Sequence, residues 1–226
     1  MKKLNTTQMG ILLRHTCVKD EQGQPLRVYR GEHGLLDPAG PGLQTLIGSL
    51  SFGTARAASR YAESPNDNRV TPQAARVYPA YLVIKNPIIN DPHEAFMEFS
   101  HLQSKIGLDL ATEFFLKNAQ WVEHTDNWGN IASDGGFSDV KEFHDKCPER
   151  MPELYTQLWP LLDDPAFIKV MKAKGFDGAI YQGSGETLDE AEYRVFDSSS
   201  VIYALSHQIE ARYSLDIKHE RNSSTP

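Results

Sequence analysis

Cysteine is scarce in this chain, with only Cys17 and Cys147 among 226 residues. The two form no C-x-x-C pair of the kind that binds zinc, and so few cysteines do not predict a disulfide framework. The eight histidines also show no metal-ligand spacing. We therefore expect no metal site.

Long apolar runs are missing as well. The apolar stretch Met9–Leu13 ends at Arg14, so it is too short for the hydrophobic part of a signal peptide or for a membrane span. We expect no membrane partner, and either a cytoplasmic location or delivery to a target cell without a cleaved signal peptide. The net charge of −7 disfavours a nucleic-acid partner, although a small basic patch stays possible.

The common nucleotide and hydrolase fingerprints are absent too. The sequence has no P-loop, no H-E-x-x-H and no G-x-S-x-G. The segment 40–45, Gly-Pro-Gly-Leu-Gln-Thr, lacks the third glycine and the following helix that a dinucleotide fingerprint requires. The sequence therefore gives no support for a Rossmann, P-loop, zincin or α/β-hydrolase site.

Hydrophobic periodicity predicts strands and helices in mixed order. Strands are expected over Leu26–Arg30, Leu46–Phe52, Val77–Ile84, Phe176–Tyr181, Glu190–Phe196 and Val201–Leu205. Helices are expected over Thr7–His15, Thr54–Ala62, Pro92–Trp121 and Met151–Lys174, with loops at 64–73 and 126–138. The length suits one domain over 1–205, followed by a polar tail over 206–226.

Several single residues predict local features of these strands and helices. Pro79 should restrict the start of its strand to a sheet edge or a bulge. Ala57, Ala58, Tyr61 and Ala62 are spaced to form one apolar helical face. Asp164-Pro165 predicts a helix start, and Gly175 predicts the end of that helix.

Two glutamates, Glu190 and Glu192, stand two residues apart at the start of a predicted strand. Residues i and i+2 of a strand leave the same face, so both carboxylates can enter one cleft. Their repulsion costs stability, which suggests a purpose for the pair. The plain structural alternative is that Arg194, on the same face, neutralises Glu192.

Two further candidates lie upstream. Arg30 ends a strand and precedes Gly31, which suits a guanidinium that holds a phosphate or ribose beside an approachable backbone. Ser51 ends another strand, where its hydroxyl could orient a carboxylate, and Tyr61 could stack on a flat ring. The plain alternatives are an exposed strand-end arginine and a capped helix with a core tyrosine.

Taken in order, these segments resemble the ADP-ribosyltransferase family. Val28-Tyr29-Arg30-Gly31 is similar to its first-strand motif, and Glu190-Ala191-Glu192 to its Glu-x-Glu. The segments 48–62, 175–181 and 192–197 are also similar to such domains in phage and plasmid polyvalent proteins. The resemblance covers about 26–85 and 164–204. It implies an α+β fold with a split mixed β-sheet core and flanking helices. The helical stretch at about 90–160 is not covered by the resemblance and is expected to be an insertion.

The resemblance also implies an enzyme that takes NAD as substrate and transfers ADP-ribose to a macromolecular acceptor, in the manner of a bacterial or phage toxin or effector. Glu192 would stabilise the oxocarbenium-like ribose. Arg30 would hold phosphate or ribose, and Ser51 would orient Glu192. Gly31, Phe52 and Tyr61 would complete the NAD site.

Glu190 would position or deprotonate the acceptor, which in the resembling Glu-x-Glu enzymes is an arginine of a protein. Three alternatives stay open from the sequence. The chain could be a catalytically inactive binding or phage structural module of the same fold, a transferase that modifies nucleic acid, or an NAD glycohydrolase.

Overall fold

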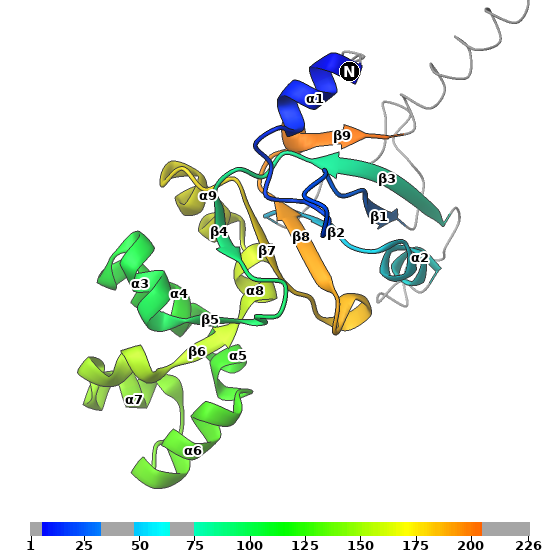
Figure 1. Cartoon of the computed structure of the whole chain (residues 1–226). Coiled ribbons are helices and arrows are strands. Elements are labelled where there is room, and N and C mark those ends of the chain that lie inside the picture. The colour runs from blue at the N-terminus through cyan, green and yellow to red at the C-terminus, as the bar shows by residue number, and fades with distance from the viewer. Residues whose placement is uncertain (1–5, 33–47, 64–74, 205–226) are drawn as a thin grey trace, which may run out of the picture.

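The structure is a computed structural model, and it describes residues 6–32, 48–63 and 75–204 (Figure 1). These residues form a mixed α+β arrangement of several small sheets with no barrel. The predicted loop at 64–73 and the predicted tail at 206–226 lie outside them, as does the start of the predicted strand Leu46–Phe52.

Two sheets hold most of the strands. The first has the order β1-β3-β9 and is antiparallel; its strands are β1 (Val28–Glu32), β3 (Arg76–Leu82) and β9 (Val201–Tyr203). The second has the order β2-β8-β7-β4; its strands are β2 (Leu50–Phe52), β8 (Ala191–Val195), β7 (Gly178–Gln182) and β4 (Pro87–Asn90). In the second sheet only the pairing of β4 with β7 is parallel.

The two sheets meet at one backbone bridge and enclose a core. Tyr29 and Gly53 each donate an N–H to the carbonyl of the other at 2.9 Å, which links β1 to the end of β2. Alternate residues of both sheets face inward, as the strand period requires. The buried side chains of this core are Val18, Val28, Leu50, Phe52, Ala80, Leu82, Ile84, Ile180, Val195 and Tyr203.

A helix-rich segment covers the other side of the second sheet (Figure 1). It contains the antiparallel hairpin β5 (Phe96–Glu98) and β6 (Tyr155–Gln157). Its helices are α3 (Phe99–Ile106), α4 (Leu108–Lys117), α5 (Ala119–Glu123), α6 (Asp126–Gly135), α7 (Val140–Lys146), α8 (Leu158–Asp163) and α9 (Pro165–Ala173), with a 3-10 turn η1 (Pro148–Glu153).

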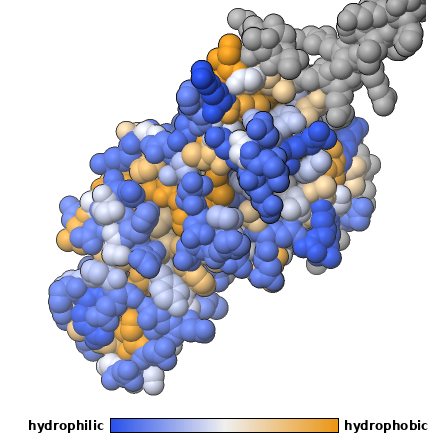
Figure 2. All heavy atoms as spheres, viewed as in Figure 1, coloured by the Kyte–Doolittle hydropathy of each residue, from blue (hydrophilic) through white to orange (hydrophobic). Residues whose placement is uncertain are grey.

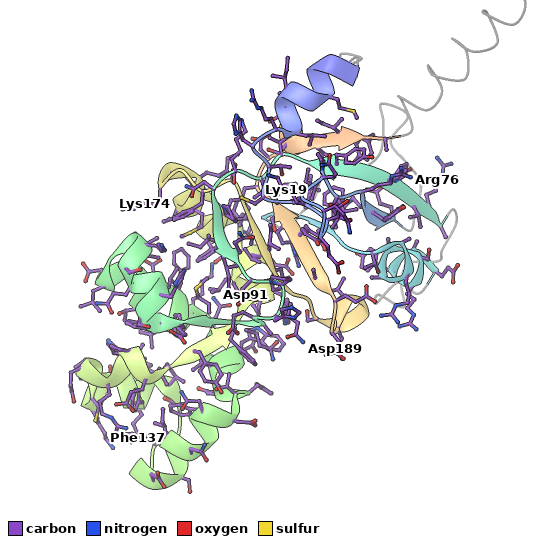
Figure 3. The ribbon with its side chains drawn as sticks, in the orientation of Figure 1. Lys19, Arg76, Asp91, Phe137, Lys174 and Asp189 are labelled. Atoms are coloured by element: carbon purple, nitrogen blue, oxygen red, sulfur yellow. The ribbon has the colours of Figure 1, made fainter. Side chains whose placement is uncertain are left out.

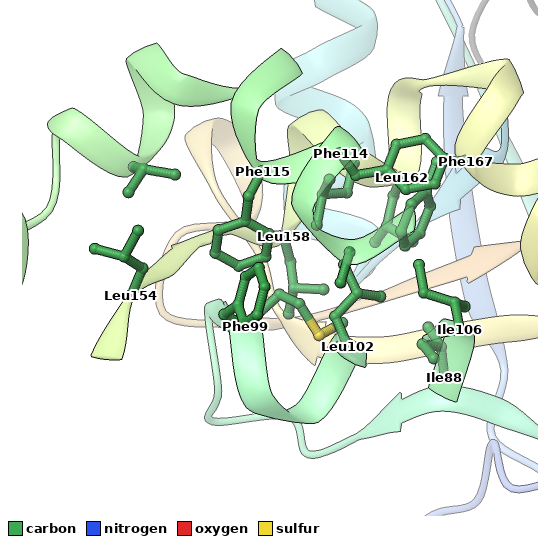
Figure 4. Close-up of a cluster of buried hydrophobic side chains, with 14 of the residues drawn as sticks. Ile88, Phe99, Leu102, Ile106, Phe114, Phe115, Leu154, Leu158, Leu162 and Phe167 are labelled. Atoms are coloured by element: carbon green, nitrogen blue, oxygen red, sulfur yellow. The ribbon is translucent and has the colours of Figure 1, made fainter. Parts of the chain in front are cut away.

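The larger hydrophobic core joins this segment to the second sheet (Figure 4). Phe99, Phe115 and Phe167 are fully buried in the same cluster as Ala179 and Tyr181 of β7. Burying aromatic side chains of this size is among the strongest stabilising contributions in a fold. The segment at 90–160 is therefore packed into the domain rather than attached beside it.

Helix boundaries follow the predicted caps in several places. Thr54 precedes α2 (Ala55–Glu63), and its hydroxyl accepts a hydrogen bond from the Ala57 N–H. Asp164 caps α9 by accepting from the Ala166 N–H, and Gly175 follows that helix with φ 88°. These three predictions are confirmed.

β3 is the central strand of its sheet, but its start up to Pro79 pairs in strand register only with β1 among the described residues, which fits the predicted edge position. Pro79 stands opposite Tyr29, whose N–H and carbonyl bond to Gly53 instead. On the other side, its carbonyl accepts from Ala204 just where the pairing with β9 ends. The missing N–H of Pro79 thus falls where no ladder hydrogen bond is needed.

The prediction of a loop at 126–138 is wrong, because α6 occupies most of that range. Thr125 caps the helix by accepting from the Trp128 N–H, and Gly136 ends it with φ 67°. Trp128 and Ile131 are buried in the larger core. Capping and burial therefore outweigh a composition rich in glycine and asparagine.

Three smaller expectations also need correction. Phe96 lies in strand β5 rather than in the predicted helix at 92–121, and β6 interrupts the helix predicted at 151–174. Tyr61 does not share the buried face of α2: Ala57, Ala58 and Ala62 are buried, whereas Tyr61 is 42% exposed. A tyrosine this exposed contributes little to the core.

The molecular face seen in Figure 2 is largely hydrophilic. Apolar side chains are exposed on α1 (Thr6–Leu13), where Ile11 is 67% exposed. Across the described part of the chain, none of the helices has both the length and the apolar character to cross a membrane.

Candidate active site

Glu192, the second residue of β8, has a buried carboxylate that accepts several hydrogen bonds. The residue is 4% exposed. Its Oε1 accepts hydrogen bonds from the Ser51 hydroxyl and the Arg194 Nε, each at 2.6 Å. Its Oε2 accepts from the Thr187 hydroxyl at 2.6 Å. Three donors therefore fix both oxygens of one buried carboxylate.

The pairing of β2 with β8 brings these groups together. Ser51 stands opposite Arg194 in the antiparallel register, so the two side chains leave the same face of the sheet. Glu192, two residues before Arg194, leaves that face as well. Thr187 comes from the short 3-10 turn η2 (Gly185–Thr187) in the loop between β7 and β8.

Glu192 is held as a carboxylate. Burial alone would raise its pKa, but the charge of Arg194 and the hydrogen bonds from Ser51, Thr187 and Arg194 oppose this, and its pKa lies below the usual value. Arg194 is buried too and stays a cation. Desolvation acts to lower its pKa, but the negative charge of Glu192 and of Asp163 raises it.

Arg194 also links the site to the helical segment. Its Nη1 donates to Asp163 Oδ1 at 2.6 Å, at the end of α8, and to the Ser49 hydroxyl at 3.3 Å. The Ser49 hydroxyl in turn donates to the carbonyl of Leu162 at 2.7 Å. Arg194 thus lies between two carboxylates, one from β8 and one from α8.

Tyr181 lies beside this group on β7, directly opposite Glu192. Its side chain is buried. Burial above all raises its pKa, while the Arg194 charge acts in the opposite direction. A neutral phenol hydroxyl therefore lies next to the Glu192–Arg194 pair.

Glu190 has separate partners from Glu192. It immediately precedes β8, and its carboxylate forms an ion pair with Arg56 and accepts a hydrogen bond from the Thr54 hydroxyl. Both partners belong to the start of α2. The loop that leads to Glu190 is marked by Asp189 in Figure 3. The two glutamates are thus each held by an arginine, one buried and one exposed.

The Arg30 side chain contacts β2, the strand that carries Ser51, at a backbone carbonyl rather than at the serine hydroxyl. Its Nη1 donates to the carbonyl of Ser51 at 3.2 Å, and its Nε donates to Glu32 at 2.8 Å. Its guanidinium carbon lies 6.0 Å from the centre of the Phe52 ring. Ser51 therefore contacts Arg30 through its carbonyl and Glu192 through its hydroxyl.

The other predicted NAD contacts are more scattered. Gly31 is buried under α2, where a Cβ would lie 2.0 Å from the carbonyl oxygen of Ala58, so its small size permits the helix to approach. Phe52 is 1% exposed in the core between the sheets. Tyr61 is exposed on α2. Their roles as NAD contacts stay predictions.

Sequence reasoning missed Thr187, Asp163, Ser49 and Tyr181. Thr187 lies within the loop that precedes Glu-x-Glu, but nothing in that loop distinguishes its hydroxyl from that of Ser184. Asp163 lies 31 residues from Arg194 and reaches it only through the packing of α8. Tyr181 could have been found, because a hairpin register between two adjacent predicted strands places it opposite Glu192.

A shallow cavity of about 180 Å³ lies at the C-terminal end of β8, whereas Glu192 lies near the start of that strand. It is lined by Gly48, Ser49, Leu50, Val195, Phe196, Asp197 and Ser198. It shares Ser49 with the hydrogen bonds of Arg194, but Glu192 does not line it. No cluster of three or more potential metal ligands occurs within the residues that the structure describes.

Searches against protein-family models, curated proteins and solved structures found no match to this chain. The arrangement of Glu192 and its donors is therefore the basis on which a function can be argued.

Proposed function

We propose that the chain is an NAD-dependent mono-ADP-ribosyltransferase that breaks the nicotinamide–ribose bond at Glu192 and passes ADP-ribose to a protein side chain. The observation that carries this proposal is the hydrogen bond from the Ser51 hydroxyl to a buried, ionised Glu192. Arginine is the favoured acceptor, because Glu190 precedes Glu192 in a Glu-x-Glu.

The chemistry suits such a carboxylate. Loss of nicotinamide leaves positive charge on the ribose, as in glycoside hydrolysis. A fixed negative charge in a site of low dielectric stabilises that charge more than the same group would in water. Ser51, Thr187 and Arg194 hold Glu192 in one orientation. Little reorganisation would then be needed as the bond breaks.

Arg30 would bind the diphosphate or a ribose of NAD. A planar guanidinium with several N–H donors suits oxyanions of this kind. The contact of Arg30 with the Ser51 carbonyl supports this role, because it places a cation on the strand that carries the glutamate's hydroxyl partner. Glu32, which holds the Arg30 Nε at 2.8 Å, would have to share that guanidinium with the phosphate.

A second candidate function is a catalytically inactive binding module of the same architecture. It is favoured by the ion pair of Glu192 with Arg194, in which the carboxylate is 4% exposed and already satisfied by three donors. Buried ion pairs of this kind also occur as purely structural elements. The two functions differ in whether NAD is consumed.

Nicotinamide release from NAD tests the proposal. The wild-type protein should release nicotinamide, and Glu192→Gln, which keeps the size of the side chain but removes its charge, should lose that activity. Glu153→Gln is the matched control, because Glu153 pairs with Arg150 on the surface. If wild-type protein releases no nicotinamide and labels no protein in a lysate given labelled NAD, the enzyme is ruled out in favour of the binding module.

The same labelled lysate separates the remaining alternatives. Label that survives nuclease treatment is attached to protein, whereas label lost with the nuclease would identify a nucleic-acid acceptor. NAD consumption without any macromolecular label would identify a glycohydrolase. Mass spectrometry of the labelled protein then gives the acceptor side chain.

A further inference from the structure

The ion pair between Glu190 and Arg56 is unlike the one between Glu192 and Arg194. The side chains of the buried pair are 5% and 7% exposed. In the Glu190 pair, the glutamate side chain is 12% exposed but Arg56 is 64% exposed. Arg56 thus reaches from solvent onto a largely covered carboxylate, where its guanidinium can also be displaced or modified.

Arg56 is therefore an arginine of the chain itself in contact with Glu190, the glutamate that the proposed function assigns to binding the acceptor side chain. Under the proposed function, Glu190 holds the guanidinium that receives ADP-ribose. Arg56 contacts the Glu190 carboxylate in this way already, while the Thr54 hydroxyl donates to the other carboxylate oxygen. We propose, on the basis of that function, that Arg56 is an intramolecular acceptor and that the chain ADP-ribosylates itself there.

The transfer balances without any further reactant. The bond between the ribose anomeric carbon and the nicotinamide nitrogen breaks, and nicotinamide leaves with the bonding electrons. A terminal nitrogen of Arg56 forms the new bond to that carbon. The guanidinium loses one proton, which passes to Glu190 and then to water. A base in direct contact is needed, because a free guanidinium holds its proton tightly.

Two consequences distinguish this site from an ordinary surface ion pair. Because Arg56 and Glu190 belong to one chain and are already in contact, transfer should be intramolecular. The fraction of protein modified per unit time should then not depend on protein concentration. Arg56 also occupies the position that an external arginine would need. External guanidino acceptors should therefore compete with Arg56, and a modified Arg56 should hinder them.

The experiment uses the full chain with NAD and follows nicotinamide release and protein mass in the same samples. We expect peptide mass spectrometry to locate ADP-ribose on Arg56, with a fraction modified per unit time that does not change with protein concentration. Arg56→Lys keeps the positive charge but lacks the guanidinium. It should abolish this label while nicotinamide release continues. Arg60→Lys, also exposed and one turn further along α2, should keep the label.

A soluble acceptor supplies an independent readout. Agmatine carries a guanidinium on a short chain, and its labelling should rise several-fold in Arg56→Ala, which removes the cation that pairs with Glu190. Unchanged agmatine labelling would contradict the proposed occupancy.

The outcomes separate the two proposals. If wild-type protein releases no nicotinamide, the proposed function fails and the self-modification fails with it. If nicotinamide is released but Arg56 carries no label, or if the fraction of Arg56 labelled per unit time rises with protein concentration, intramolecular modification of Arg56 is wrong and the proposed function stands.

Discussion

Ser51 donates a hydrogen bond of 2.6 Å to Glu192, although 141 residues separate the two in the chain. The contact follows from the register of β2 with β8, which places Ser51 opposite Arg194 and leaves its hydroxyl beside the carboxylate two residues earlier. This hydrogen-bond partner of the glutamate is therefore positioned by strand pairing rather than by a loop.

Ser51→Ala should slow nicotinamide release without unfolding the protein. Loss of a hydrogen bond to a charged group costs about 1.5–3 kcal/mol, which corresponds to a roughly 10- to 100-fold lower kcat if the bond acts in the transition state. Ser104→Ala, which removes a hydroxyl bonded to a backbone carbonyl on α3, is the control and should leave kcat unchanged. Steady-state kinetics with NAD measure both. An unchanged kcat in Ser51→Ala would show that the hydroxyl does not orient a catalytic group.

Glu190→Gln should separate transfer from hydrolysis. Under the proposed function, Glu190 accepts the proton of the acceptor guanidinium but has no part in breaking the nicotinamide bond. We expect protein labelling to fall at least tenfold while NAD hydrolysis continues, measured as labelled protein and free nicotinamide in the same reaction. Equal loss of both activities would assign Glu190 to NAD cleavage as well.

Arg194→Met should destabilise the fold severely. It leaves Glu192 and Asp163 without their shared cation, and removing one partner of a buried ion pair costs about 3–5 kcal/mol. Urea denaturation followed by circular dichroism measures the free energy of unfolding. Lys172→Met, which removes an exposed ion pair with Asp197, should leave the urea midpoint nearly unchanged. A small effect of Arg194→Met would show that water reaches the site and replaces the lost charge.

The stability of the wild-type protein should fall in acid more steeply than that of Glu192→Gln. The pKa of Glu192 is lowered in the folded state. Its contribution is therefore present above the unfolded pKa, about 4.3, and is lost as the pH falls through the folded pKa. Urea titrations from about pH 6 to about pH 3 should show the stability difference between the two proteins shrinking. A constant difference would mean that Glu192 titrates normally.

Gly31→Ala should damage the packing of α2 on β1. The added Cβ would lie 2.0 Å from the carbonyl oxygen of Ala58, so the helix must move away, at a cost of about 1–3 kcal/mol or more. Gly129→Ala is the matched control. Its Cβ would meet nothing within 4 Å inside helix α6, and it should stabilise the fold by about 0.5–1 kcal/mol. Thermal melting compares the two.

The sequence predicts much of this arrangement because its signals are local. The caps at Thr54 and Asp164, and the neutralisation of Glu192 by Arg194, depend on residues at most four positions apart, and the structure contains all three. The contact of Ser51 with Glu192 was expected from the family resemblance and is present, while its catalytic role stays a prediction.

What the sequence does not predict depends on packing between distant segments. The contact of Asp163 with Arg194 requires the position of α8 against β8, which no periodicity encodes. Pro79 is accepted within β3 because it stands opposite Tyr29, which bonds to Gly53 in the other sheet, and because it precedes the first β3–β9 pair. In both cases the local arrangement depends on a contact with a residue that is distant in the sequence.

The separation of Ser51 from Glu192 also has a consequence for the order of folding. The whole helical segment lies between them in the chain, and its helices pack mostly on near neighbours in sequence, which form fastest. Pairing β2 with β8 must close a loop of 141 residues, which carries a larger entropic cost. During synthesis Glu192 emerges after both Ser51 and the helical segment. The carboxylate site would therefore be among the last parts of the domain to assemble.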